Sequence, residues 1–589
     1  MKHDLFLGDA ILRIDDSDGA AVLIACGSRE RLVAFPHLAM LVPSATTHKG
    51  CFHVVDAREN EVECSVQSDL FRAQVIFRST PAFLTVETRL DVLEDFELNR
   101  LSIFPNGTEL NLYDVVNYRH RHYTPILWPE QLLGGKGCAT DTFSGDWQFA
   151  PHPSMMMFRK EDLTLCVGAV DLPTSFGMYL RATDYRIDEM YLNYGEAGFG
   201  LTLYKGDRWA PPRFCMFLDR GRSPIETTRR YTDLLVETGR IPDPVQKIRY
   251  GWHRSPLYCT WMDQGFVAED TPADELGEQQ LTGSNPTVEA CSEEFVHQIL
   301  ACMDAESLKF RTFLLDDGWQ VTRGQWDAHP ERFPNLRGLV DELHELGMKV
   351  IVWWNWAEVF DDAEIDESEL AGQGWRNKHG RRVRDYSDPK TQESYLKPLF
   401  HKFFSSDPGC YDFDGFKSDF LADKVHPDMP LKDPAWRGEE NYCYRLFELC
   451  YKEMKAHKPD ACHVGCAGHP YLAEFIDINR TYDVATSNVM EHVNRGTMLK
   501  ALTPGCPVAY DLHNYVERFA EYFELAVQND ASIQIGNILG MRQDRLSPWV
   551  PADSHFYDVL RTGLSQLAKD DRSQVVEKEP VPAVQLGRP

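Results

Sequence analysis

Residues 336–354 read LRGLVDELHELGMKVIVWW, a helical pattern followed directly by an apolar one. Leucine and valine recur over 336–346 at the spacing of one helix face, and Gly347 stands where that helix is expected to end. The run 349–354 is apolar almost without interruption, which is typical of a strand buried on both faces. A helix leading into such a strand is the repeating element of an α/β fold.

The same alternation continues through the second part of the chain. Eight runs have the length of strands, and helical patterns fill most of the intervals between them. We predict a closed (β/α)8 TIM barrel, because no GxGxxG motif follows a strand to favour a doubly wound open sheet. The predicted strands are Ile248–Trp252, Phe310–Leu315, Val350–Trp354, Gly415–Asp419, Cys462–Cys466, Tyr482–Ser487, Pro507–Asp511 and Ser532–Ile538.

The first 240 residues have a different pattern. Short alternating runs such as Ala73–Phe77 and Leu165–Ala169 recur between turn residues, which predicts an antiparallel β-sandwich. A helical stretch around 226–238 then leads into the linker Ile241–Pro244. The predicted organisation is therefore a β-sandwich domain with a linker helix at 1–243, a catalytic barrel at 244–570 and a C-terminal tail at 571–589.

Charge and composition exclude several classes of partner. The 589 residues include 61 Lys+Arg and 90 Asp+Glu, a net charge of -29, which disfavours nucleic acid and anionic membranes. No stretch approaches the ~20 apolar residues that cross a bilayer, and the first residues lack a signal-peptide core. The 15 cysteines are scattered without CxxC pairs, as in proteins whose thiols stay reduced. We expect a cytoplasmic protein.

The predicted strand ends carry the candidate chemistry, because TIM-barrel active sites lie at the C-terminal ends of the strands. Carboxylates hydrogen-bond sugar hydroxyls, indole rings stack on sugar faces, and paired carboxylates cleave glycosidic bonds. These residue types together predict a sugar site. The segments concerned are Asp316–Trp319, Trp353–Trp356 with Glu358 close behind, Lys417–Asp419, Cys466 and Asp511.

Three of the motifs resemble those of the clan D retaining α-galactosidases, glycoside hydrolase families thirty-six and twenty-seven: DDGW at 316–319, KSD at 417–419 and RTYDV at 480–484. The segment DYSDP at 385–389 is also similar to one found in these families and in family thirty-one. A sandwich ahead of the barrel is closest to family thirty-six. The resemblance implies a retaining exo-glycosidase that removes terminal α-linked galactose, or a related sugar such as α-N-acetylgalactosamine, from a small glycoside. It implies no cofactor, and assembly into a homo-oligomer.

The resemblance also implies roles for single residues. It makes Asp419 the nucleophile and Asp483 the acid/base, with Asp477 and Glu491 as alternatives because the family spaces its arginine and acid differently. Retention of configuration requires the two carboxyl groups to lie ~5–5.5 Å apart. The other implied contacts are Asp316 and Asp317 at the 4- and 6-hydroxyls, Lys417 at neighbouring hydroxyls, Arg480 or Cys466 near the 2-position, and Trp319, Trp353 and Trp356 as walls for the sugar rings.

Two other functions remain open at this stage. One is a glycosyl-transferring synthase resembling raffinose synthases, and the other is a sugar-binding barrel without catalysis. A metal site is not predicted, because His469, His492 and His513 lack HxH or HExxH spacing. Asp412 and Asp414 precede the fourth predicted strand, so we expect them at the bottom of the barrel or in a loop.

Overall fold

The protein is described from a computed structural model. Among its described residues, no helix is both long and apolar enough to cross a membrane. The described part of the chain is residues 1–569 without 9, 16–18, 27–30, 36–37, 42–46, 106–107, 111–113, 118–125, 129–138, 144–153, 184–185, 269–284, 378–379, 421–424, 467, 482–488, 513–517 and 543–546. The predicted tail at 571–589 and the predicted strand at Tyr482–Ser487 lie outside these residues.

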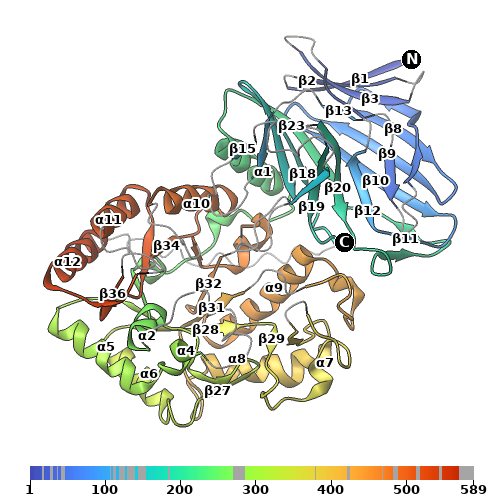
Figure 1. Cartoon of the computed structure of the whole chain (residues 1–589). Helices are drawn as coiled ribbons and strands as arrows, with labels where there is room; N and C mark the ends of the chain where they lie inside the picture. The colour runs from blue at the N-terminus through green and yellow to red at the C-terminus, as the bar shows by residue number, and fades with distance from the viewer. Residues whose placement is uncertain are drawn as a thin grey trace.

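The second part of the chain forms a closed barrel of eight parallel strands, which confirms the predicted fold class (Figure 1). The strands pair in chain order, and the last pairs with the first. They are β24 (Leu257–Cys259), β25 (Thr312–Leu315), β28 (Lys349–Asn355), β31 (Gly415–Asp419), β32 (Cys462–Gly465), β33 (Ile478–Arg480), β34 (Val508–Leu512) and β35 (Ser532–Ile535).

Two of the eight predicted strands are wrong. The first strand is Leu257–Cys259, whereas the predicted run Ile248–Trp252 precedes it and leads into a 3-10 turn at Gly251–Arg254. The sixth strand is Ile478–Arg480, upstream of the predicted segment. Each of the two observed strands has only three residues, too few to show a periodic pattern of apolar side chains. Both are fully buried, and their pairing within the barrel rather than their sequence identifies them as strands.

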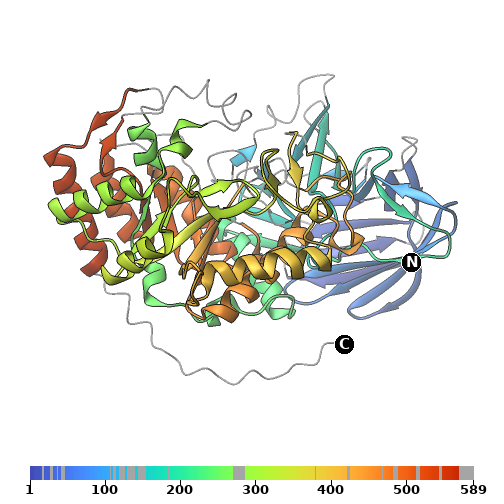
Figure 2. The same ribbon diagram turned by 90° about the horizontal axis from the view of Figure 1, so that it is seen from below.

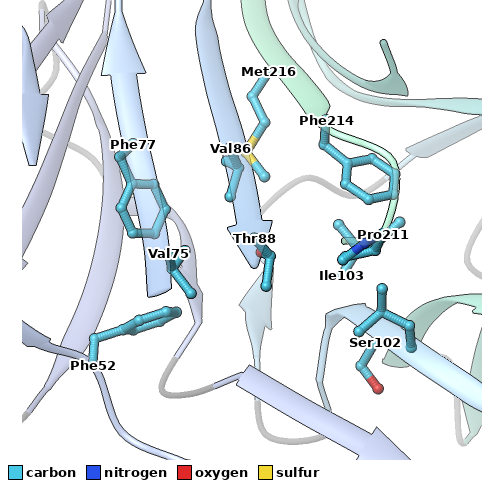
Figure 3. Close-up of a pocket in the computed structure, with 11 residues that line it drawn as sticks. Phe52, Val75, Phe77, Val86, Thr88, Ser102, Ile103, Pro211, Phe214 and Met216 are labelled. Carbon is cyan, nitrogen blue, oxygen red and sulfur yellow. The ribbon is translucent and has the colours of Figure 1, made fainter. Parts of the chain in front are cut away.

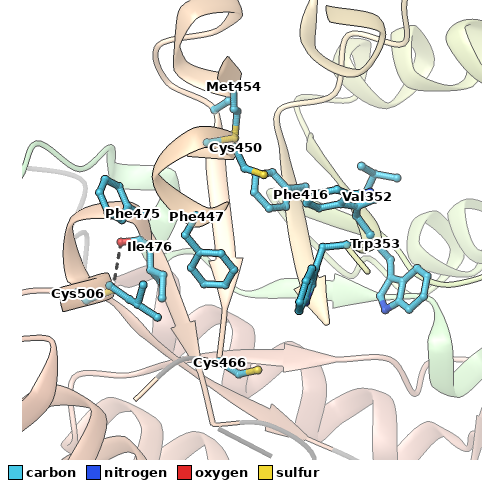
Figure 4. Packing of buried hydrophobic residues seen from close by; sticks show 14 of the residues in the cluster. Val352, Trp353, Phe416, Phe447, Cys450, Met454, Cys466, Phe475, Ile476 and Cys506 are labelled. Atoms are coloured by element: carbon cyan, nitrogen blue, oxygen red, sulfur yellow. Dashed lines mark hydrogen bonds between the residues drawn. The ribbon is translucent and has the colours of Figure 1, made fainter. Parts of the chain in front are cut away.

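Helices surround the barrel in Figures 1 and 2. Buried apolar side chains of the strands and of these helices form one hydrophobic cluster. In Figure 4, Val352 and Phe416 on neighbouring strands lie beside Phe447 and Cys450 of one such helix. Gly347 has a positive φ of 79° where the predicted helix at 336–346 ends. The helices are α2 (Trp261–Val267), α4 (Pro286–Glu289), α5 (Glu293–Ala305), α6 (Leu336–Glu345), α7 (Pro389–Thr391), α8 (Lys397–Phe404), α9 (Glu439–His457), α10 (Val489–Leu502), α11 (Phe519–Gln528) and α12 (Ser554–Lys569).

The N-terminal part consists of antiparallel sheets, as predicted (Figure 1). A five-stranded sheet contains β1 (Lys2–Leu7), β2 (Ala10–Asp15), β3 (Ala20–Ala25), β4 (Arg31–Phe35) and β13 (Glu109–Leu110). A ten-stranded sheet contains β15 (Ile126–Trp128), β14 (Asp114–Asn117), β17 (Met155–Lys160), β18 (Leu163–Ala169), β23 (Phe214–Arg220), β10 (Leu84–Val92), β9 (Phe71–Ser79), β8 (Glu61–Gln67), β7 (His53–Arg58) and β22 (Arg208–Trp209). A six-stranded sheet contains β16 (Ala139–Phe143), β19 (Met178–Thr183), β20 (Arg186–Asn193), β12 (Arg100–Phe104), β5 (Leu38–Leu41) and β6 (Thr47–Gly50).

These sheets bury a second hydrophobic core, separate from that of the barrel. Alternate residues of β9 and β10 face it, as expected for strands with one buried side. A small apolar cavity of about 50 Å³ lies in this core, and Phe77, Val86 and Phe214 are among its walls (Figure 3). The sandwich is therefore a packed body of its own.

The two parts meet through helix α1 (Pro224–Glu237) and through buried polar contacts. Glu440 of α9 accepts a hydrogen bond from Ser154, which stands just before β17, and pairs with His469 at 2.8 Å. Arg437 donates to the carbonyl of Tyr194 at 2.6 Å. Since Ser154, Glu440 and His469 are all buried, these contacts fix the sandwich against the loop that follows β32.

Candidate functional site

The site is a polar layer at the C-terminal end of the barrel interior. Side chains alternate along a strand, so every second residue points inward. The inward residues deeper in the barrel form an apolar cluster of Leu257, Leu314, Ile351, Cys462, Val464, Ile478 and Ala509, with Cys259 at its boundary to the next layer. Continuing along the same faces leads to the polar layer, which we define as Cys259, Asp316, Trp353, Lys417, Asp419, Arg480, Asp511 and Gln534.

Asp419 is a hydrogen-bonded carboxylate that keeps contact with solvent. Trp353 Nε1 donates to its Oδ2 at 3.0 Å, and Arg480 Nη2 donates to its Oδ1 at 2.6 Å. Lys417 Nζ lies 3.7 Å from Oδ2. The side chain is 13% exposed, whereas Arg480 is 1% exposed. Two cations and an indole N–H thus hold this carboxylate in one orientation while it keeps contact with solvent.

Lys417 is bound more tightly to Asp316 than to Asp419. Its ammonium donates to Asp316 Oδ2 at 2.7 Å, and the Cys259 thiol donates to the same oxygen at 3.2 Å. Burial alone would lower the pKa of Lys417, but the carboxylates of Asp316 and Asp419 outweigh it and raise that pKa well above its usual range. Lys417 therefore stays a cation at every pH at which the protein is folded.

Arg480 is held in place from the opposite side by a chain of buried hydrogen bonds. Gln534 Nε2 donates to Asp511 Oδ1 at 2.6 Å, and Arg480 Nη1 donates to Asp511 Oδ2 at 2.5 Å. Arg480 Nη2 is the group that binds Asp419. The chain thus runs from the eighth strand to the fourth, and it fixes the guanidinium plane through two carboxylates.

Asp317 belongs to a second ion-pair network, beside the polar layer. Arg323 donates to Asp317 Oδ2 from Nη2 at 2.7 Å and lies 3.5 Å from Glu358. Its guanidinium also stands 5.2 Å from the centroid of the Trp353 ring. Burial would lower the pKa of Arg323, but the carboxylates of Asp317 and Glu358 raise it. Asp317 is consequently a charge-neutralised wall of the site.

The three predicted tryptophan walls are not equivalent. Trp353 lies in the polar layer, but Trp319 is fully buried among Phe403, Tyr411 and Phe413. Trp356 is 2% exposed and packs against aromatic rings, among them Tyr442 of α9 at 5.6 Å between centroids. Trp319 and Trp356 therefore pack in aromatic core, whereas Trp353, which is equally buried, reaches the polar layer through its hydrogen bond to Asp419.

Of the three candidates for the acid/base, only Asp477 can be placed in the structure. Asp483 lies outside the described residues, as does the side chain of Glu491. Asp477 immediately precedes β33, at the opposite end of that strand from Arg480, and it pairs with Lys247 and Lys455. This position rules out Asp477 as a partner of Asp419. Cys466 is fully buried just beyond β32 (Figure 4).

The candidate metal ligands are occupied by protein contacts. His492 Nδ1 lies 2.9 Å from the Thr481 hydroxyl, His469 pairs with Glu440, and His513 lies outside the described residues. Asp412 and Asp414 lie at the barrel bottom, as predicted, beside Lys458. Asp341, His344 and Asp412 have potential ligand atoms within 4.8 Å of one another, but Arg337 pairs with both carboxylates.

Two contributing residues, Arg323 and Gln534, were missed by the sequence prediction, whereas Glu358 follows the third predicted strand closely and is noted there. Arg323 lies in the turn between β26 (Gln320–Thr322) and β27 (Gln325–Ala328), where no motif marks it. Glu358 opens the short hairpin β29 (Glu358–Val359) with β30 (Arg382–Val383). Gln534 was the one detectable case, since a glutamine inside an otherwise apolar strand calls for a buried hydrogen-bond partner.

Comparisons with known proteins agree with this architecture. The model of the glycosyl hydrolases family 31 TIM-barrel domain matches residues 240–521. A curated relative, "A type blood alpha-D-galactosamine galactosaminidase" from Flavonifractor plautii, is 49% identical over 174 residues. That match covers 26% of this chain and 16% of the relative, so the chain spans about a sixth of the relative's length.

Solved structures resemble the chain over almost its whole length. The α-N-acetylgalactosaminidase NagBb from Bifidobacterium bifidum, solved with GalNAc, has a TM-score of 0.61 at 10% identity and covers 96% of this chain and 93% of its own. The GH36 α-galactosidase AgaB from Geobacillus stearothermophilus has a TM-score of 0.56 at 12% identity, covering 97% and 85%. At these identities the likeness shows the fold, a sandwich followed by a TIM barrel, and the match to the family model lies in the barrel.

Proposed function

We propose that the chain is a retaining clan D glycoside hydrolase, closest to family thirty-six, which removes a terminal α-linked galactose or a 2-amino or 2-acetamido derivative of it from a small glycoside. The observation that carries the proposal is the Asp419 carboxylate, accessible yet fixed by Trp353 Nε1 and the Arg480 guanidinium beside the Lys417–Asp316 pair. A carboxylate prepared in this way suits nucleophilic attack on an anomeric carbon.

The reaction would proceed in two displacements. Asp419 attacks the anomeric carbon while a second carboxylic acid protonates the leaving oxygen, and a glycosyl–enzyme ester forms. Water, deprotonated by the same second group, then releases the sugar with its original configuration. We assign the second group to Asp483, which stands three residues beyond the last residue of β33, on the side where the catalytic loops of a TIM barrel begin.

The relative's printed name favours an amino sugar as one member of the substrate set. A free 2-amino group is a cation, and the polar layer holds three carboxylates, Asp316, Asp419 and Asp511, against the two cations Lys417 and Arg480. Such an excess of negative charge tolerates a cationic sugar as well as a neutral one. The sugar is therefore to be tested rather than assumed.

A panel of 4-nitrophenyl α-glycosides of galactose, N-acetylgalactosamine and galactosamine tests the proposal. At least one is expected to be cleaved, with α-configured sugar as the first product by NMR. Inversion would reject the two-displacement mechanism, and no cleavage of any member would leave the sugar-binding barrel as the better function. A transferring synthase would instead give mainly transfer products when a large excess of acceptor sugar is present.

Removing the charge of Asp511 is expected to lower kcat/KM about 100-fold, because Arg480 then loses its second anchor and Asp419 its fixed position. The variant is Asp511→Asn, and its steady-state kinetics are measured on the best glycoside of the panel. Asp460→Asn, at the barrel bottom, is the matched control, and equal losses in both variants would contradict the positioning role.

A further inference from the structure

A polar pocket of about 180 Å³ lies beside the candidate site, on the far side of Asp317. Its walls come from β26, from the start of α4 and from the segment that follows β29, and they include Val321, Thr322 and Asp362. It shares two groups with the network described above, the Asp317 carboxylate and the Arg323 guanidinium. No residue of the polar layer lines it, so it is a separate space that adjoins the site.

The chemistry of the walls suits an uncharged, hydroxylated group. Two arginines and three carboxylates line the pocket, so charges of both signs are present and neither an anion nor a cation is strongly selected. Thr322 donates to Asp362 Oδ1 at 3.0 Å, and Asn285 has its oxygen committed to the amide of Thr287. Hydrogen-bond donors and acceptors thus line the pocket together with apolar side chains such as Val321. This mixture matches a sugar ring, which has both hydroxyl groups and apolar C–H faces.

The barrel order places this pocket away from the leaving group. The strands close in the order β24, β25, β28, β31, β32, β33, β34, β35, so β25 and β33 stand opposite each other. The proposed acid Asp483 follows β33, and the leaving oxygen must be near it. A sugar bound between them therefore points its far side, with the 4- and 6-hydroxyls, at Asp317 after β25.

The hydrogen bonding of Asp317 permits a substituted oxygen at that position. Its carboxylate accepts from Gln320 Nε2 at 2.6 Å and from Arg323 Nε and Nη2 at 3.2 and 2.7 Å. These three donors already satisfy a buried carboxylate, so it does not depend on a hydroxyl proton from the substrate. A substrate that brings an ether oxygen instead of a hydroxyl therefore leaves this carboxylate hydrogen-bonded, and the donor for the ether oxygen would be the neighbouring Arg323 guanidinium.

We propose that the pocket beside Asp317 binds a second sugar unit attached to O4 or O6 of the cleaved residue, so that the enzyme also releases substituted sugars, such as disaccharides, from α-glycosides. This inference rests on the proposed function for the orientation of the substrate. It extends the substrate class from single terminal sugars to those that carry a neutral substituent at the far side.

The test compares a 4-nitrophenyl α-galactoside with the same compound carrying a β-linked galactose at O4 or at O6. The outer β-linkage is not a substrate for an α-specific enzyme, so mass spectrometry of the released sugar shows directly whether an intact disaccharide leaves. We expect wild type to release the disaccharide with kcat/KM within about ten-fold of the value for the simple galactoside.

Filling the pocket should separate the two substrates. Val321→Trp and, from the rim, Asp362→Trp are expected to lower kcat/KM for the substituted glycoside by about ten-fold or more and to leave the simple one within about two-fold. Leu346→Trp, at an exposed position beyond α6, is the matched control. Equal activity of the filled variants on both substrates, or no disaccharide release by wild type, would overturn the proposal.

Failure of the proposed function gives a different result. If no glycoside is cleaved, the nucleophile assignment falls, and titration calorimetry with free β-galactosyl-galactose then tests the pocket alone. Binding by wild type that the Val321→Trp variant loses would support the pocket, and absence of binding would overturn it.

Discussion

Replacing Asp419 by glycine is expected to lower hydrolysis of the best aryl α-glycoside by about 10⁴-fold or more, because the first displacement has no substitute nucleophile. The fold should survive, since the side chain lies at the solvent-facing end of the polar layer and is 13% exposed. Circular dichroism and thermal unfolding of the variant check that point.

Azide distinguishes a lost nucleophile from a damaged site. The glycine leaves room for a small anion beside Arg480 and Lys417, which otherwise bind the carboxylate. Azide placed there attacks the anomeric carbon and yields a β-glycosyl azide, with the configuration inverted once. We expect its formation to restore release of nitrophenol in proportion to azide concentration.

Asp419→Asn is the matched control for the rescue. Its amide fills the same volume and leaves no room for azide, so this variant should be inactive with or without the anion. Near-normal hydrolysis by Asp419→Gly, with no azide adduct, would reject Asp419 as nucleophile. An α-configured azide product would instead show that attack comes from the other face of the sugar.

The success of the sequence prediction depended on strand length. Strands β28 and β31, of seven and five residues, were predicted to within one or two residues, because their patterns are long enough to show their periodicity. The three-residue strands β24 and β33 were misplaced, since contacts across the barrel define them rather than local pattern. The error at β33 also made Arg480 a residue before the strand, whereas it ends the strand inside the polar layer.

Side-chain direction was predictable inside strands but not beyond their ends. Alternation puts Lys417 and Asp419 on one face, and the structure confirms that both lie in the polar layer. Trp319 and Trp356 stand just past strand ends, where the period of two no longer applies and the turn sets the direction. Both side chains point into the aromatic core. Core residues and site residues therefore stand only a few positions apart in the sequence, so the motif alone does not tell them apart.

Replacing Asp477 by asparagine is expected to cost about 3–5 kcal/mol of folding stability, the second large effect, at the end of the barrel opposite the site. Asp477 is fully buried and lies 3.0 Å from Lys247 and 3.3 Å from Lys455, which are themselves 13% and 20% exposed. It also accepts from the Tyr451 hydroxyl at 2.9 Å. The variant keeps the shape of the side chain but leaves the two ammonium groups without their shared counter-charge.

The pH dependence of this effect identifies its electrostatic origin. Burial alone would raise the pKa of Asp477, but Lys247 and Lys455 lower it well below its usual range. Its contribution is therefore complete above the pKa of about 3.9 of an aspartate in the unfolded chain and is lost as pH falls toward the lower folded value. Urea titrations give the difference in free energy of unfolding between wild type and variant. This difference should stay constant from about pH 5 to about pH 8 and shrink below about pH 4.

Asp341→Asn provides the matched control for this experiment. Its carboxylate is 51% exposed and pairs with Arg337 at 2.8 Å on the surface of α6, so its loss should cost less than about 1 kcal/mol. A comparable loss in both variants, or a loss at Asp477 that does not change with pH, would contradict the buried ion-pair account. Activity of the folded Asp477→Asn variant should equal that of wild type, because the barrel interior separates Asp477 from the polar layer.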